Sequence, residues 1–131
     1  MKIIIESQNP KLMRYATVGD YVWEDGTLHI TVADMGNENY NYLVALHELV
    51  ESWLCQQRGI KEEDISTFDI QYEKEREEGK HTISDEPGFD ENAPYRKEHT
   101  IATGIEIIMA EQLGINWNDY NNTVENLDVG E

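Results

Sequence analysis

The sequence predicts an α+β fold, in which a small antiparallel sheet packs against two main helices. Two observations favour this class. Apolar residues alternate in the first third of the chain, as in half-buried strands, whereas a helical period begins near residue 39 and another near residue 95. The strands therefore precede the helices instead of alternating with them, which is typical of α+β proteins.

The strand signals lie in three short segments. Lys2–Ile5 reads as a buried strand, and Asn9-Pro10 ends it. Residues 21–24 and 27–33 flank Asp25-Gly26, a dipeptide that suits a tight hairpin turn. The second arm of this hairpin places three apolar residues on one face: Leu28, Ile30 and Val32.

The helical signals cover two longer segments. Residues 39–57 carry a broad apolar stripe, and Gly59 is a natural residue to end that helix. Residues 95–113 repeat the pattern. Between them, residues 61–69 begin a shorter element, and an acidic connection over about 73–97 contains two of the three prolines. We expect a single domain over 1–131, with mobility in this connection and in the tail over about 121–131.

The charge and the cysteine count exclude several classes of protein. The formal net charge of -17 opposes binding to nucleic acids and to anionic membranes, whereas it favours a basic protein partner. Cys55 is the only cysteine, so the chain forms no internal disulfide. No apolar run approaches the length of about 18 residues that a membrane span needs. We expect a cytoplasmic protein.

Histidine and glutamate occur at matching places on the two main helices. An α-helix turns about 100° per residue, so His47 and Glu51 lie on one flank of the first helix. His99 and Glu106 lie within about 20° of each other on the second. Both pairs fall at the border of an apolar stripe. If the two borders face each other, four groups that can bind a metal converge.

The chemistry of these groups suits zinc or another divalent metal. Zinc accepts nitrogen and oxygen ligands, and a catalytic site keeps three protein ligands with one open position. We predict that His47, Glu51 and His99 are the ligands and that Glu48 is a general base for the bound water. Glu106 or Glu98 would orient His99 by a hydrogen bond to its second nitrogen.

The segment ALHELVESWLC resembles the active-site helix of the zincins, the metallopeptidases with an H-E-x-x-H motif. His47 matches the first metal ligand and Glu48 the catalytic glutamate, whereas Glu51 occupies the place of the second histidine. In the family an edge strand precedes this helix and runs past the substrate cleft, and residues 27–33 have that position. The resemblance implies a zinc-dependent hydrolase that acts on a peptide or a small molecule.

Other interpretations remain open from the sequence. His47 and Glu51 are also a helix-supporting pair four residues apart, and the metal could be structural and join the two helices. A non-catalytic acidic protein that mimics nucleic acid and occupies a basic partner is a different class. Fainter still, LHELVE and EHTIA are similar to pieces of HD-type metal phosphohydrolases, although their order is reversed.

Overall fold

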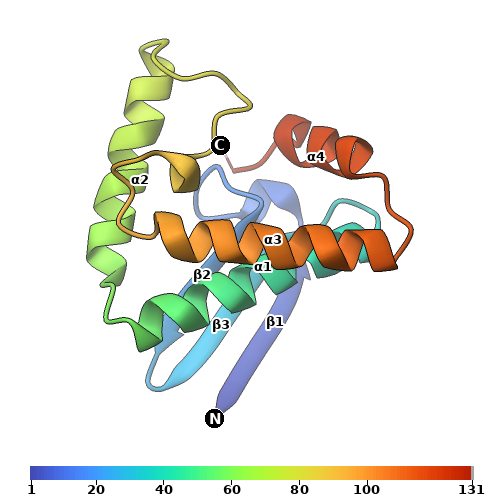
Figure 1. The fold of residues 1–131 in the computed structure, drawn as a ribbon, viewed down its shortest axis with the longest axis horizontal. Coiled ribbons are helices and arrows are strands. Elements are labelled where there is room, and N and C mark those ends of the chain that lie inside the picture. The colour runs from blue at the N-terminus through green and yellow to red at the C-terminus, as the bar shows by residue number, and fades with distance from the viewer. Residues whose placement is uncertain (131) are drawn as a thin grey trace.

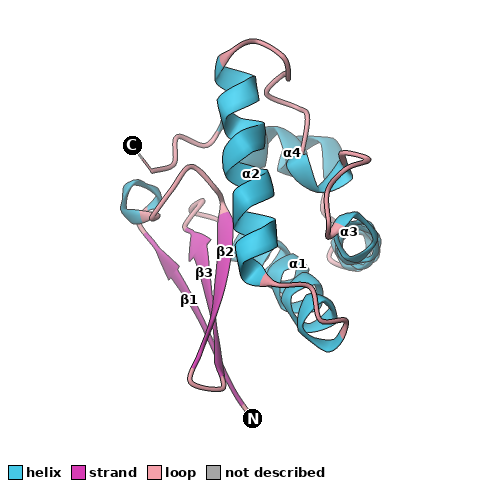
Figure 2. Ribbon diagram, turned by 90° about the vertical axis from the view of Figure 1, so that its left-hand side faces the viewer, coloured by secondary structure: helices cyan, strands magenta, loops and turns pink. Residues whose placement is uncertain are grey.

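The computed structural model describes residues 1–130, and the α+β class is confirmed. Three strands, β1 (Lys2–Gln8), β2 (Gly19–Glu24) and β3 (Thr27–Ala33), form one sheet. Four helices follow them: α1 (Glu38–Gln57), α2 (Glu62–Glu77), α3 (Arg96–Gln112) and α4 (Trp117–Asn126). The sheet, α1 and α3 lie in successive layers, and α2 stands at the side of β2 (Figures 1 and 2).

The sheet is mixed, so the prediction of an antiparallel sheet is wrong for one of its two pairings. The strand order is β1-β3-β2; β2 and β3 form the predicted antiparallel hairpin, but β1 pairs with β3 in parallel, from Lys2 beside Thr27 to Gln8 beside Ala33. The reason is that β3 inserts between the two earlier strands. The alternation of apolar residues along a strand predicts which face is buried, but it does not predict which strand lies beside it.

The local signals for the hairpin and for α1 behave as the sequence predicts. Asp25 and Gly26 both adopt positive φ, of 50° and 77°, as a two-residue hairpin turn requires. The side chain of Asn37 accepts a hydrogen bond from the backbone N–H of Tyr40 and caps α1, and Gly59, with φ of 70°, follows its C-terminus.

The prediction of two main helices is confirmed in α1 and α3, and the chain forms two further helices, one of them where a shorter element was expected to begin. The charged segment after residue 62 forms α2 over 16 residues, and the closing segment forms α4, so residues 121–126 of the expected tail are helical. The last residue of that tail, 131, lies outside the described residues. α4 has a clear function in the fold, because its Tyr120 is buried in the core that β3 and α1 build from residues such as Leu28, Ile30 and Leu43.

No helix among residues 1–130 is both long enough and apolar enough to cross a membrane.

Candidate metal centre and pocket

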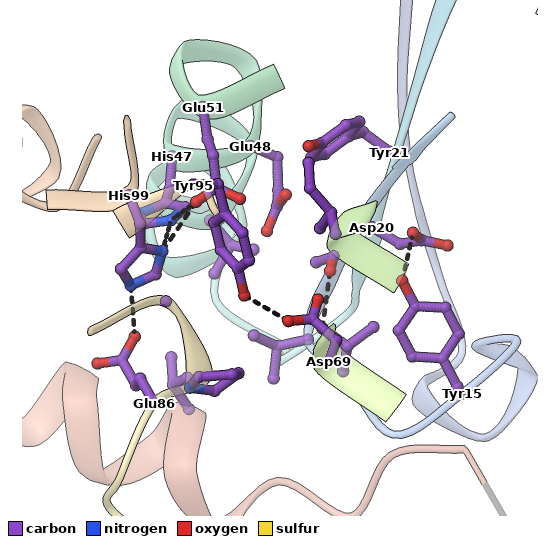
Figure 3. Close-up of a pocket in the computed structure, with 18 of the residues that line it drawn as sticks. Tyr15, Asp20, Tyr21, His47, Glu48, Glu51, Asp69, Glu86, Tyr95 and His99 are labelled. Carbon is purple, nitrogen blue, oxygen red and sulfur yellow. Dashed lines mark hydrogen bonds and ion pairs between the residues drawn. The ribbon is translucent and has the colours of Figure 1, made fainter. Parts of the chain in front are cut away.

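The side chains of His47, Glu51 and His99 meet at one point between α1 and α3 (Figure 3). Nε2 of His47 lies 2.9 Å from Oε2 of Glu51, and Nδ1 of His99 lies 2.8 Å from the same oxygen. The two ring nitrogens are 3.1 Å apart. Zinc–nitrogen and zinc–oxygen bonds are about 2.0–2.2 Å long, so three donor atoms at these separations fit around one ion.

The second nitrogen of each imidazole is also bonded to a carboxylate. Nδ1 of His47 lies 2.8 Å from Oε1 of Glu106, and the hydroxyl of Tyr120 donates to the other oxygen of Glu106 at 2.5 Å. Nε2 of His99 lies 3.1 Å from Oε1 of Glu86, in the segment between α2 and α3. In metal sites this second bond fixes the tautomer of the histidine and turns its other nitrogen towards the metal.

The three central groups are buried, with exposed fractions of 9% for His47, 6% for Glu51 and 8% for His99. Burial by itself favours the neutral form of an imidazole, but the hydrogen bonds that His47 donates to Glu106 and Glu51 outweigh it and raise the pKa of His47 well above 6.5. Burial likewise opposes the charge of His99, and Glu51 and Glu86 raise the pKa of His99 to about 9.

Glu51 shows the complementary effect. Burial favours its neutral form, but hydrogen bonds from His47 and His99 lower the pKa of Glu51 to about 2. The cluster therefore concentrates one permanent negative charge between two imidazoles. A divalent cation bound at this point would replace the protons of the two imidazoles.

Glu48 lies beside this cluster in a cavity of about 230 Å³. Burial, and then the charge of Glu51, raise the pKa of the Glu48 carboxyl to about 8. No residue in the range 1–130 donates a hydrogen bond to it. Its side chain packs against the backbone of Gly19, where an added Cβ would come within 2.6 Å of Oε1 of Glu48. The glycine in β2 thus makes room for this carboxylate.

Two tyrosines extend the pocket away from the imidazoles (Figure 3). The hydroxyl of Tyr95 donates to Oδ1 of Asp69, from α2, at 2.5 Å. Burial raises the pKa of Asp69 to about 6 despite this hydrogen bond. The hydroxyl of Tyr21, from β2, is buried and has no hydrogen-bond partner among residues 1–130. Figure 3 places Glu48 between Tyr21 and the imidazoles.

The segment that joins α2 to α3 covers one side of His99. A Cβ on Gly88 would lie 2.3 Å from Cγ of His99, so only glycine allows this close approach. The ring of Phe89 contacts the ring of His99 edge to face, with centroids 4.6 Å apart. Arg76 holds the start of the segment, because its guanidinium donates to the carbonyl oxygens of Ile83 and Asp85.

Neither Glu106 nor Glu98 contacts the second nitrogen of His99, so the predicted partners of that nitrogen are wrong. Glu106 bonds to His47 and not to His99. Glu98 lies on a different side of α3, where it accepts a hydrogen bond from Arg58 at 2.6 Å. His99 uses Glu86 instead, which reaches it from a segment of irregular structure. The sequence carried only weak signals for Glu86, Asp69 and Tyr120, since none of them lies on a helix side shared with a histidine.

The strand before α1 also differs from the prediction. β3 is the central strand of the sheet and not an edge strand. The edge strand that borders the pocket is β2, through Gly19, Asp20 and Tyr21. The zincin layout of edge strand, turn and helix is thus absent in that order, although an edge strand does line the pocket.

Comparison with known proteins gave no match, whether to protein-family models, to curated proteins or to solved structures. The protein can therefore be classified only by its own fold and site. The protein is a small α+β domain with a buried imidazole–carboxylate cluster beside a pocket.

Proposed function

We propose that this protein is a zinc-dependent hydrolase of zincin-like type, with Glu48 as its general base. His47, Glu51 and His99 would hold the metal. The observation that carries the proposal is that three donor atoms within 3.1 Å of one another border a cavity with an unpartnered carboxylate. Two nitrogens and one carboxylate oxygen suit zinc, although other divalent metals accept the same donors. When bound, zinc would lower the pKa of a coordinated water towards 7.

The residues of the pocket have separate tasks in this proposal. Glu48 takes up a proton from the attacking water and holds it; a bound cation beside it would lower its raised pKa and keep the carboxylate ionised for this step. Glu106 and Glu86 keep the two imidazoles in their orientations.

The size of the cavity bears on the substrate. Its volume of about 230 Å³ is below the range of roughly 300–1,000 Å³ that is usual for ligand pockets. The substrate therefore places a small group inside, as a short peptide or a small molecule would. A cytoplasmic location belongs to the same proposal, because a chain with one cysteine does not depend on an oxidising compartment.

A structural metal is the second candidate, and the deep burial of the three ligands favours it. In that case the ion would join α1 to α3 and contribute to folding without turnover. Glu48 distinguishes the two candidates, because a structural site has no use for a carboxylate that makes no hydrogen bond.

Metal analysis and one substitution test the proposal. We expect about one zinc per chain after purification with zinc and dialysis, and loss of the metal in His99→Ala. Glu48→Gln should keep the metal and abolish cleavage of a mixture of synthetic peptides, read by mass spectrometry. The matched control is Glu111→Gln, the same change at an exposed site on α3, which should alter neither property. A metal-free wild-type protein would contradict the proposal, and bound metal with no Glu48-dependent cleavage would favour the structural candidate.

A further inference from the structure

The two edges of the sheet are covered differently. β2 forms one edge, where α2 stands beside it and the carboxylate of Glu62 accepts a hydrogen bond from the backbone N–H of Trp23 at 2.9 Å. β1 forms the other edge, and Figures 1 and 2 show no helix or strand along its outer side. Within residues 1–130, the backbone of residues 2–7 makes no hydrogen bond outside its ladder with β3. A row of unused N–H and C=O groups therefore remains along β1.

β1 lacks the bulge and the proline that often keep an edge strand from pairing. All seven of its residues, from Lys2 to Gln8, pair with β3 in a regular register, and Pro10 comes only after its end. The strand also contains three consecutive isoleucines, which favour the extended conformation. A long and regular edge of this kind is a template for an additional strand.

A second cavity, of about 410 Å³, lies beside this edge, between β1, β3 and α1. Its volume is within the range of roughly 300–1,000 Å³ that is usual for ligand pockets. The apolar residues that line it are Ile5, Val32, Tyr42, Ala45, Leu46 and Leu49. Ile5 pairs with the buried Ile30 of β3, so it is on the face of the sheet that the helices cover. Every second side chain of a strand added beside β1 would point into this cavity.

The charges around the cavity are negative. Glu6 and Glu38 line it and are exposed, and no lysine, arginine or histidine lines it. Lys2 is at the other end of β1, about 13 Å from Glu6 at 3.3 Å per residue. Lys11, which follows the strand, is already paired with Asp128. A basic segment is therefore attracted to this edge, whereas a second copy of a chain of charge -17 is repelled.

We propose that the free edge of β1 binds an extended segment of a basic protein, which pairs with β1 as a fourth strand. Apolar side chains of the segment enter the cavity beside Ile5 and Leu46. Glu6 points to the opposite face of the sheet from Ile5, because neighbouring residues of a strand alternate. A lysine or arginine between two apolar residues of the segment then lies opposite Glu6, and such pairs of opposite charge stabilise adjacent strands. The backbone hydrogen bonds supply affinity, and the cavity and the charges supply specificity.

The site is independent of the metal centre and of any hydrolysis, because the two cavities share no lining residue. Zinc or a chelator should therefore leave the binding of the basic segment unchanged.

Three labelled peptides test the proposal by fluorescence anisotropy with the full chain. The first has eight residues in which lysine alternates with valine. The second has glutamate in place of each lysine. The third is the first peptide with methyl groups on its two central backbone nitrogens, which leaves the charge and the side chains unchanged but removes two hydrogen-bond donors.

We expect the first peptide to bind with a dissociation constant at least about tenfold lower than that of either other peptide. Added salt should weaken its binding, because salt screens the attraction. Equal binding of the methylated peptide would show attraction by charge without strand pairing, and it would overturn the proposal. No binding of the first peptide up to about 1 mM would overturn it as well, and so would a dimer of this chain that occupies the edge and excludes the peptide.

Two substitutions locate the binding site. Glu6→Lys should raise the dissociation constant of the first peptide about fivefold or more, because an attractive cross-strand pair becomes repulsive. The control is Glu24→Lys, the same change at an exposed glutamate of β2. Ile5→Thr keeps a residue that favours strands but removes apolar contact with the segment, so it should also weaken binding, whereas Ile70→Thr on α2 should not. Circular dichroism checks that all four variants fold. Unchanged binding in either Glu6→Lys or Ile5→Thr would contradict the arrangement.

Discussion

On α1, the side that faces the pocket carries His47 and Glu51, whereas the apolar residues Leu46 and Trp53, on another side, are partly exposed. On α3, His99 and Glu106 face the pocket, and Ile108 faces solvent. This is the reverse of the usual arrangement in a globular protein, in which charged groups are on the surface.

This contrast shows that the residues of the pocket side are not those that stability alone would favour. Burying ionisable groups costs free energy unless each is paired, and here His47, Glu51 and His99 are paired with one another and with Glu106 and Glu86. Apolar side chains of similar volume would fill the space at no such cost. A cluster of this kind is typical of a functional site, and an exposed apolar side is typical of an interface.

The largest expected effect comes from Glu51→Ala on the pocket side. Removal of the shared carboxylate leaves two buried imidazoles without their common partner, so we expect the free energy of unfolding to fall by about 3 kcal/mol or more. Urea denaturation in the presence of a chelator measures this loss. The stabilisation that added zinc confers on the wild type should also disappear. An unchanged response to zinc would show that Glu51 is not a ligand.

Tyr120→Phe tests a contact on the pocket side that supports a metal ligand without touching the metal. The substitution removes the hydroxyl that bonds to Glu106, which in turn orients His47. We expect zinc affinity to fall by about tenfold to a hundredfold, the usual effect of losing such an outer contact. Competition with a fluorescent chelator measures the affinity. Tyr42→Phe, at an exposed tyrosine of α1, is the control and should bind zinc as the wild type does.

Stability should depend on pH through Asp69, since burial raises its pKa from 3.8 to about 6. Between pH 4 and pH 6 the folded protein holds a proton that the unfolded chain has lost. The contribution of Asp69 to the free energy of unfolding is therefore fully present below pH 4, and it is lost as the pH rises to 6. Asp69→Asn should be more stable than the wild type above pH 6, by roughly 2 kcal/mol, with the difference shrinking towards pH 4. Thermal denaturation across this range, with chelator present, would contradict the assignment if the difference stayed constant.

The smallest effects are expected from two glycines, with opposite signs. Gly88→Ala places a methyl group against His99 and should destabilise the protein by about 1–2 kcal/mol. Gly104→Ala, within α3, meets nothing within 4 Å and should stabilise it by about 0.5–1 kcal/mol through helix propensity. Parallel urea titrations compare the two. Equal effects would mean that the contact between Gly88 and His99 is not tight in solution.

Much of the fold and the centre of the site could be predicted because the signals were local. Alternation identified the hairpin, and the Asp25-Gly26 turn set its register. Helical spacing put His47 and Glu51 on one flank, and this relation holds in any fold that keeps the helix. Metal binding by these residues, and hydrolysis with Glu48 as base, stay predictions.

The remainder depended on contacts between distant segments. The sequence by itself determined the two main helices, their polar flanks and the residue types able to bind a metal, because these follow from rotation per residue. Only the tertiary structure decided that β1 joins β3 in parallel, that Glu86 reaches His99, and that Tyr120 supports Glu106. It also decided that the polar flanks are buried and part of the apolar stripe is exposed. Periodicity distinguishes the sides of a helix, but only packing selects which side faces inward.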